Sequence, residues 1–196
     1  RWRPGLAAQL RHNASMPSSG VRLARTPDVD DVAAVNIAAW RLRFAGVLPD
    51  EVLDGLDAGD LAMVWASGIL NPPTPGHRLL VAVDDDRVVG YAAIGPCQDP
   101  DADELTGALL ALEVDPAVHR QGHGSRLMAA AMDHVGAAGM TTAGTWCPVH
   151  DEARRAFLQS GGWGQDTAFR DVAVGIQDDG TDRVVREVWL ATLLAE

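Results

Sequence analysis

Residues 109–128 constrain the fold of this 196-residue chain more than any other stretch. An apolar run stops at Asp115-Pro116, and a short basic loop with two glycines follows it. The residues after this loop predict a helix from about residue 122 to residue 138. This order of strand, glycine loop and helix presents successive backbone N–H groups at a helix N-terminus, which is an arrangement that binds phosphate.

The composition of the loop suits an anion. A Cβ atom at Gly122 or Gly124 would keep a phosphate group from approaching the backbone amides. Four basic side chains are expected to place positive charge around the loop. The same side chains would also be compatible with the solvent-exposed start of a helix that binds no anion. These basic side chains are His119, Arg120, His123 and Arg126.

Two common phosphate-binding motifs do not fit this loop. The dinucleotide fingerprint requires a third glycine where Leu127 stands. The nucleotide P-loop requires a lysine after its last glycine, and the chain contains no lysine. On its own, the loop is equally compatible with a glycine-rich turn that binds no ligand.

The loop resembles the acetyl-CoA pyrophosphate loop of the GNAT superfamily of acetyltransferases. The family pattern, Arg/Gln-x-x-Gly-x-Gly/Ala, falls on His119, Gly122 and Gly124. His119 departs from it, since arginine or glutamine is usual at that position. Residues 150–163 are similar to the second signature of the family, which usually ends Phe-Tyr-x-x-x-Gly-Phe.

The other expected elements follow in the order of that family, and the resemblance covers about residues 21–194. It implies an α/β fold of the α+β type. Its central sheet is mixed and mostly antiparallel, splayed between the fourth and fifth strands, with helices on both faces. We expect one domain over residues 21–196 and a tail or extra arm over residues 1–20. The expected strands lie at 21–24, 77–83, 88–94, 140–146, 168–176 and 184–194, with helices at 26–40 and 151–160 and a turn at 178–180.

The resemblance implies direct transfer of an acetyl group from acetyl-CoA to an amine, and no metal. The pantetheine arm would lie in the splay and pair with the backbone of Leu112 and Val114. The loop from His119 to Ser125 would hold the pyrophosphate. The residues expected to contact the cofactor are Leu112, Glu113, Val114, His119, Arg120, Gln121, Gly122, His123, Gly124, Ser125, His150 and Leu158.

The proton transfers are less well defined by the sequence. Glu113 is the candidate general base because it lies on the cofactor strand, although an exposed or arginine-paired carboxylate would have the same pattern. Further candidates are Glu104, Asp115 and His150. Leu158 stands where the family commonly has a tyrosine acid, and the one tyrosine of the chain is Tyr91.

Acceptor recognition is expected near Trp40 and Phe44, which are four residues apart and share one helical face. A core stripe explains that spacing equally well. The sequence does not separate a small amine from a protein amine as the acceptor.

Composition excludes several classes of partner. The net charge of −11 disfavours nucleic acid, and no 18-residue apolar run predicts a membrane span. Two cysteines, Cys97 and Cys147, predict a reduced, cytoplasmic setting, with Cys147 a structural thiol rather than a nucleophile. The six histidines lack metal-binding spacing. A homodimer is kept as one expected oligomeric state.

A second hypothesis is an acyl-CoA-binding sensor or partner subunit with weak or no catalysis. Leu158 supports it, as does the absence of an acid at Thr145 or Trp146 on the fifth strand.

Overall fold

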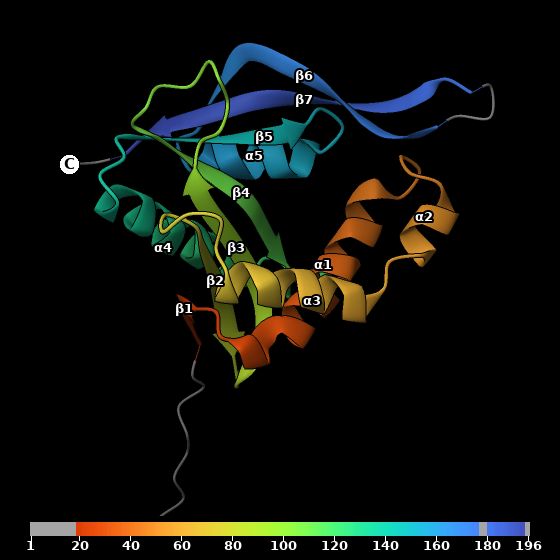
Figure 1. Ribbon diagram of the computed structural model, residues 1–196, viewed down its shortest axis with the longest axis horizontal. Coiled ribbons are helices and arrows are strands. Elements are labelled where there is room, and N and C mark those ends of the chain that lie inside the picture. Colours follow the sequence, from red (N-terminus) through yellow and green to blue (C-terminus); the bar gives the residue numbers. More distant parts are fainter. Residues whose placement is uncertain (1–18, 177–179, 195–196) are drawn as a thin grey trace, which may run out of the picture.

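The computed structural model describes residues 19–176 and 180–194, so residues 1–18 of the expected tail lie outside the described part. Within it, seven strands form one sheet in the order β1-β2-β3-β4-β5-β7-β6 (Figure 1). Neighbouring strands are antiparallel except β4 and β5, which are parallel. The expected fold class is therefore confirmed. The strands are β1 Gly20–Leu23, β2 Arg78–Asp84, β3 Arg87–Pro96, β4 Thr106–Val114, β5 Thr142–Pro148, β6 Gly164–Ile176 and β7 Asp182–Leu193.

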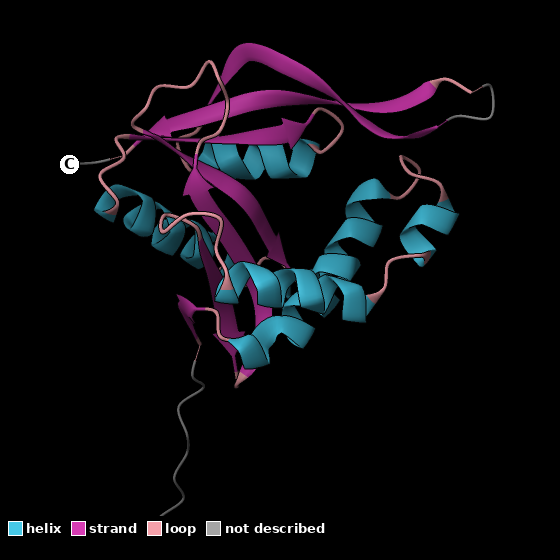
Figure 2. Cartoon of the chain, in the orientation of Figure 1, coloured by secondary structure: helices cyan, strands magenta, loops and turns pink. Residues whose placement is uncertain are grey.

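Helices cover both faces of the sheet, as expected (Figure 2). A large core cluster joins the sheet to α4 and α5, through residues such as Leu127 and Leu158. A smaller cluster on the other face joins Val32 and Val35 of α1 to Tyr91 of β3, with Trp65 of α3 packed against it. The helices are α1 Val29–Phe44, α2 Asp50–Asp54, α3 Ala58–Leu70, α4 His123–Ala137 and α5 Glu152–Ser160, with 3-10 turns at Thr26–Asp28 and Pro116–Val118.

Local sequence signals explain the ends of several elements. The Asp151 side chain accepts a hydrogen bond of 2.9 Å from the backbone N–H of Arg154, which confirms it as the N-cap of α5. Gly161 is the C-cap, as expected, but it is Gly162 that adopts the left-handed conformation, with φ of 88°. The β2–β3 hairpin turns at Asp85 and Asp86, both with positive φ.

Some boundaries differ from expectation. The helix expected over residues 26–40 is a 3-10 turn followed by α1, which continues to Phe44. The strand expected at 140–146 begins at Thr142 and continues to Pro148. Residues 178 and 179 of the expected turn lie outside the described residues. Helix α3 was not expected, because apolar side chains occur all round it and Met63, Val64 and Leu70 are exposed.

The splay between β4 and β5 is present. The two strands share only three residue pairs, from Thr106–Thr142 to Ala108–Gly144. Beyond them, β5, β7 and β6 run across the direction of β2, β3 and β4 (Figure 1). β4 has a bulge at Leu110, just past the last residue pair that it forms with β5. The bulge interrupts the β3–β4 pairing, in which Ala93 and Ile94 are partners of the residues on either side of Leu110. Such a bulge bends a strand and redirects its side chains. In the described residues, no helix is long and apolar enough to cross a membrane.

We expect Asp28→Asn to destabilise the protein by about 1–2 kcal/mol at neutral pH. Asp28 forms two hydrogen bonds with Arg22, of 2.7 and 2.8 Å, and accepts one from the Arg25 N–H. The hydrogen bonds from Arg22 lower the pKa of the Asp28 carboxyl. The contribution of the Asp28 carboxylate to folding stability is therefore complete above the pKa of the unfolded state, about 3.9. It is lost as the pH falls through the lower pKa of the folded state.

Urea unfolding of wild type and Asp28→Asn at several pH values tests this expectation. Asp30→Asn, at an exposed position in the first turn of α1, is the control and should change stability little. A stability difference that persists unchanged under strongly acidic conditions would show that the Asp28 carboxylate does not produce it.

Candidate active site

The edge of β4 beside the splay carries backbone groups that have no strand partner. The Asp115 N–H bonds to the Val89 carbonyl, so alternate residues of β4 pair with β3. Leu112 and Val114 therefore direct their peptide groups away from β3, toward the splay. Side chains replace the missing strand there: Arg154 Nη1 donates to the Leu112 carbonyl at 2.8 Å, and His119 Nε2 lies 3.0 Å from the Val114 carbonyl.

The glycine loop connects this edge to α4. Arg120 and Gly122 both adopt left-handed conformations, with φ of 65° and 82°. Left-handed residues in such a turn direct successive N–H groups into one concavity, which favours an anion. A Cβ built at Gly122 would come no closer than 3.8 Å to another group, so the left-handed backbone is what requires glycine here.

The structure places two residues of the loop beside other side chains. A Cβ at Gly124 would lie 3.5–3.7 Å from the Phe157 and Val114 side chains, which is ordinary van der Waals contact. The His123 side chain is 3% exposed, with Nδ1 2.9 Å from Arg126 and Nε2 4.0 Å from Asp84. It therefore lies beneath the loop and not on its outer surface with His119 and Arg120.

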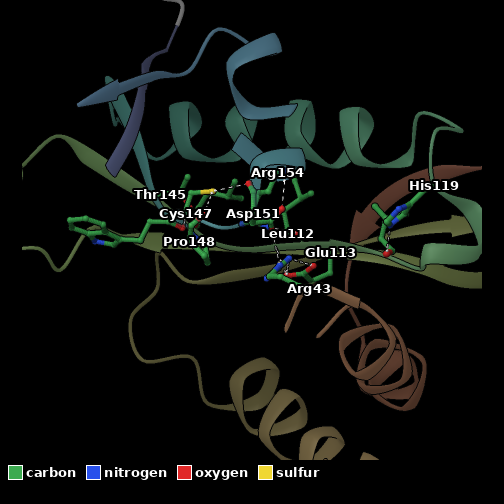
Figure 3. A network of polar contacts seen from close by, with 12 residues as sticks. Arg43, Leu112, Glu113, His119, Thr145, Cys147, Pro148, Asp151 and Arg154 are labelled. Carbon is green, nitrogen blue, oxygen red and sulfur yellow. Dashed lines mark hydrogen bonds and ion pairs between the residues drawn. The ribbon is translucent and has the colours of Figure 1, made fainter. Parts of the chain in front are cut away.

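A buried ion cluster spans the splay (Figure 3). Arg43 of α1 donates to both carboxylate oxygens of Glu113, and its Nε lies 2.9 Å from Asp151 at the start of α5. Arg154 lies 3.8 Å from Glu113 on the other side. The cluster links α1, β4 and α5, and every charge in it faces an opposite charge, which is the condition for stable burial.

Burial and these charges set the protonation of the groups nearby. Burial opposes the charge of Arg43, but Glu113 and Asp151 raise the pKa of its guanidinium above the ordinary value. Burial, reinforced by Glu113, raises the pKa of Tyr91, so its phenol is neutral at physiological pH. Burial also raises the pKa of the Cys147 thiol, which supports a structural role because thiols react as thiolates.

Two cavities lie beside β4 and β5, and α1 and α3 contribute to the lining of the smaller one. The cavity beside the ion cluster has a volume of about 330 Å³, and Trp40, Phe44 and Glu113 line it. The larger one, of about 650 Å³, lies at the vertex of the splay, beside Thr145 and Gly144. Leu110, Trp146 and Glu187 line both cavities, so the two adjoin.

The remaining candidates lie in different surroundings. His150 is exposed, with its ring centroid 5.7 Å from that of Phe44. Leu158 is 1% exposed and belongs to the core beneath α4 and α5. Asp115 caps the 3-10 turn after β4 and pairs with Arg87 at 2.9 Å. Gln121 and Ser125 are exposed on the loop, and Glu104 is exposed in the turn before β4.

Neither Arg43 nor Arg154 was predicted from the sequence as a site residue. Arg43 is 70 positions from Glu113, so only the fold shows the pairing. Arg154 lies within the second signature, and a charged residue on a helix that packs against the sheet was the one indication that it could belong to the site. No group of three or more His, Cys, Asp or Glu side chains in the described residues is arranged to hold a metal ion.

Comparison with known proteins identifies the family. Residues 56–163 match the family described as Acetyltransferase (GNAT) family, and this region is more than half of the chain. The chain belongs to this family. The GNAT match includes the third helix, the splayed strands, the glycine loop and α5, so the resemblance of the loop and of the second signature is confirmed.

One curated relative and several solved structures resemble this GNAT chain. It is 29% identical over 110 residues to an uncharacterized N-acetyltransferase, YuaI, of Bacillus subtilis, and the match spans 56% of this chain and 60% of that relative. The fold resembles the putative acetyltransferase yncA from Salmonella typhimurium with acetyl-CoA, at 20% identity and a TM-score of 0.64, covering 91% of this chain and 95% of that one.

It also resembles the PaiA N-acetyltransferase from Thermoplasma acidophilum in complex with coenzyme A, at 16% identity and a TM-score of 0.64, covering 86% and 98% of the two chains. A ribosomal-protein-alanine N-acetyltransferase from Brucella melitensis has 19% sequence identity to this chain and a TM-score of 0.66. The match covers 89% of this chain and 99% of that one. At these identities, the structures establish the fold.

We expect Gly144→Ala to destabilise the protein by about 1–3 kcal/mol, because a Cβ at the vertex would lie 1.8 Å from the Trp189 ring. Trp189 packs against Trp146 at 5.1 Å between ring centroids, so moving it aside would disturb this contact. Thermal unfolding measures the effect. The control is Gly136→Ala in α4, where nothing lies within 4 Å, and this change should stabilise by up to about 1 kcal/mol. Equal melting temperatures for the two variants would contradict the packing described.

Proposed function

We propose that this protein is an N-acetyltransferase that transfers the acetyl group of acetyl-CoA directly to an amine. The observation that carries the proposal is the position of the β4 edge. The end of β4 leads to the glycine loop, and residues along the same strand line two cavities. Membership of the GNAT family supports the activity, as do the complexes of fold neighbours with coenzyme A and with acetyl-CoA.

The residues of the loop and of the β4 edge fit acetyl-CoA. Backbone N–H groups between His119 and Ser125 would hold the pyrophosphate, helped by the N-terminus of α4. The peptide groups of Leu112 and Val114 would accept and donate hydrogen bonds along the pantetheine arm. Arg154 and His119 already bond to these two carbonyls, so we propose that both side chains shift or share their acceptors when the cosubstrate binds.

The amine would occupy the smaller cavity, between Trp40, Phe44 and Glu113. Acetyl-CoA supplies the activated thioester, and its thiol is acidic enough to leave as a thiolate near neutral pH. Glu113 remains the candidate general base because it lines this cavity. Its pairing with Arg43 gives it a second role, which is to hold α1 against β4.

Two further parts of the proposal concern the setting of the enzyme. Cys97 and Cys147 are free thiols, which supports a reducing, cytoplasmic location. A homodimer stays a prediction, and gel filtration with light scattering measures it.

The acyl-CoA sensor stays as a second candidate because both oxygens of Glu113 accept hydrogen bonds from Arg43. Both oxygens are occupied, so Glu113 would have to release a contact with Arg43 before it could take the proton of an amine. Thermal stabilisation by acetyl-CoA, without CoA release across a broad panel of amines, would favour the sensor over the enzyme.

We expect Gly122→Asp to abolish the thermal stabilisation that acetyl-CoA gives the wild type. That stabilisation is about 2.7 kcal/mol at 100 times the dissociation constant. The new carboxylate would place negative charge where the loop binds an anion. Gly122→Asn is the matched control, because asparagine has the same shape, tolerates the left-handed conformation and carries no charge. A full response to acetyl-CoA in both variants would remove the loop from the binding site.

We expect Glu113→Gln to lower turnover by about a hundredfold, because an amide cannot accept the proton of the amine. The matched control is Arg43→Lys, which keeps Glu113 and a positive charge. It loses the guanidinium that contacts Glu113 and Asp151 at the same time. If Glu113 is the base, this control keeps most of the turnover. Steady-state rates, measured below both melting temperatures, decide the matter. An equal loss in the two variants would show that Glu113 acts only by holding Arg43.

A further inference from the structure

The walls of the smaller cavity are mainly apolar and come from distant parts of the chain. Trp40 and Phe44 of α1 pack edge to face, with 5.5 Å between their ring centroids. Trp65 of α3 lies beside Tyr91, with 4.9 Å between ring centroids. The opposite wall is the β6–β7 arm, which contributes Val172, Val174 and Val185. Arg183 ties this arm to the Val47 carbonyl between α1 and α2, so the valines are held over the cavity.

The charged groups that line the cavity are already paired. Arg43 and Arg154 face Glu113, and Arg43 also pairs with Asp151. Glu187 accepts from Arg170 at 2.7 Å. Of the described residues lining the cavity, neither carboxylate lacks a cationic neighbour, and the two arginines, Arg43 and Arg154, match the two carboxylates, Glu113 and Glu187. The one amide, Asn36, accepts from the indole of Trp65 at 3.3 Å.

This charge balance limits what the cavity can accept. A second ammonium on the acceptor, or a carboxylate beside its amine, would bury a charge without a partner, which is strongly unfavourable unless the group is neutralised. A single amine avoids that cost by entering without its proton, because an apolar site favours the neutral form. The volume of about 330 Å³, with the larger cavity adjoining it, is enough for a small amine.

We propose that the acceptor is a small primary amine with an aromatic or aliphatic body, whose amine is its one charged group. This inference rests on the proposed function, since it names the substrate class of the same site. It excludes polyamines, aminoglycosides and free amino acids as preferred acceptors.

Matched amines test the proposal directly. Pentylamine and 1,5-diaminopentane differ by one distant ammonium, and 2-phenylethylamine and phenylalanine differ by one carboxylate. We expect kcat/KM to be at least about tenfold higher for the first member of each pair. A preference for the diamine or for the amino acid would overturn the proposal while confirming acetyl transfer.

Binding separates this proposal from the proposed function. Calorimetry with protein saturated in CoA measures amine affinity without turnover. We expect both apolar amines to bind under these conditions. If acetyl-CoA binds but neither apolar amine does, the substrate class is wrong, whatever other amine reacts. If the apolar amines bind but no amine in the panel releases CoA, the proposed transfer fails and the apolar site stands.

A matched pair of variants places the selectivity in this cavity. Val172 and Ala173 are neighbours on β6; Val172 lines the cavity, whereas Ala173 is exposed. Val172→Asp adds an unpaired carboxylate to the wall, so it should lower kcat/KM for pentylamine at least about tenfold and shift preference toward the diamine. Ala173→Asp should leave both values unchanged.

Thermal unfolding checks that both variants fold. If Val172→Asp does not fold, Val174→Asp replaces it, because Val174 lines the same cavity. Unaltered selectivity in the folded cavity variants, or the same change in Ala173→Asp, would contradict the proposed acceptor site.

Discussion

A sheet whose strands separate must satisfy the backbone groups that lose their partners. Here β4 leaves β5 after three residue pairs, and side chains from three elements replace the absent hydrogen bonds. Thr145 donates to the Leu109 carbonyl at 2.7 Å, Arg154 to that of Leu112, and His119 lies within bonding distance of that of Val114. A side chain can rotate away from a carbonyl at far lower cost than a strand can detach. The edge is therefore satisfied and yet accessible to an extended ligand.

The electrostatics of the site depend on the same opening. Since β4 and β5 separate, the start of α5 lies close enough to β4 for Asp151 and Glu113 to share Arg43. This guanidinium ties together two parts of the sheet that no backbone hydrogen bond joins at that level. It also balances negative charge at the smaller cavity of an acidic protein, whose net charge is −11.

The sequence was sufficient for features that are local. Asp115-Pro116 ended β4, Gly122 began α4, and Asp151 capped α5, each through backbone requirements of neighbouring residues. Their order, compared with the GNAT family, predicted the sheet and its splay. Helix α3 was missed because its apolar residues do not form a stripe.

The site was less predictable because its contacts are distant in sequence. Glu113 was a candidate from its strand alone, but its partner Arg43 lies on α1 and its position relative to Arg154 depends on the whole sheet. The loop pattern suggested that His123 faces a ligand, whereas the packing of α4 buries it. Trp40 and Phe44 fitted both a core stripe and a cavity wall, and the β6–β7 arm decides between them by leaving a cavity beside them.

The two core clusters have a consequence for how this protein can change. Leu127 and Leu158 stabilise the face beneath α4 and α5, whereas Val32 and Tyr91 stabilise the face beneath α1 and α3. Substitutions in the second cluster, and at Val172 or Val174 of the β6–β7 arm, can therefore accumulate without removing a side chain from the packing behind the glycine loop. Such a division makes the chain evolvable: new acceptor preferences can arise by drift on one face while the other face keeps its ancestral chemistry.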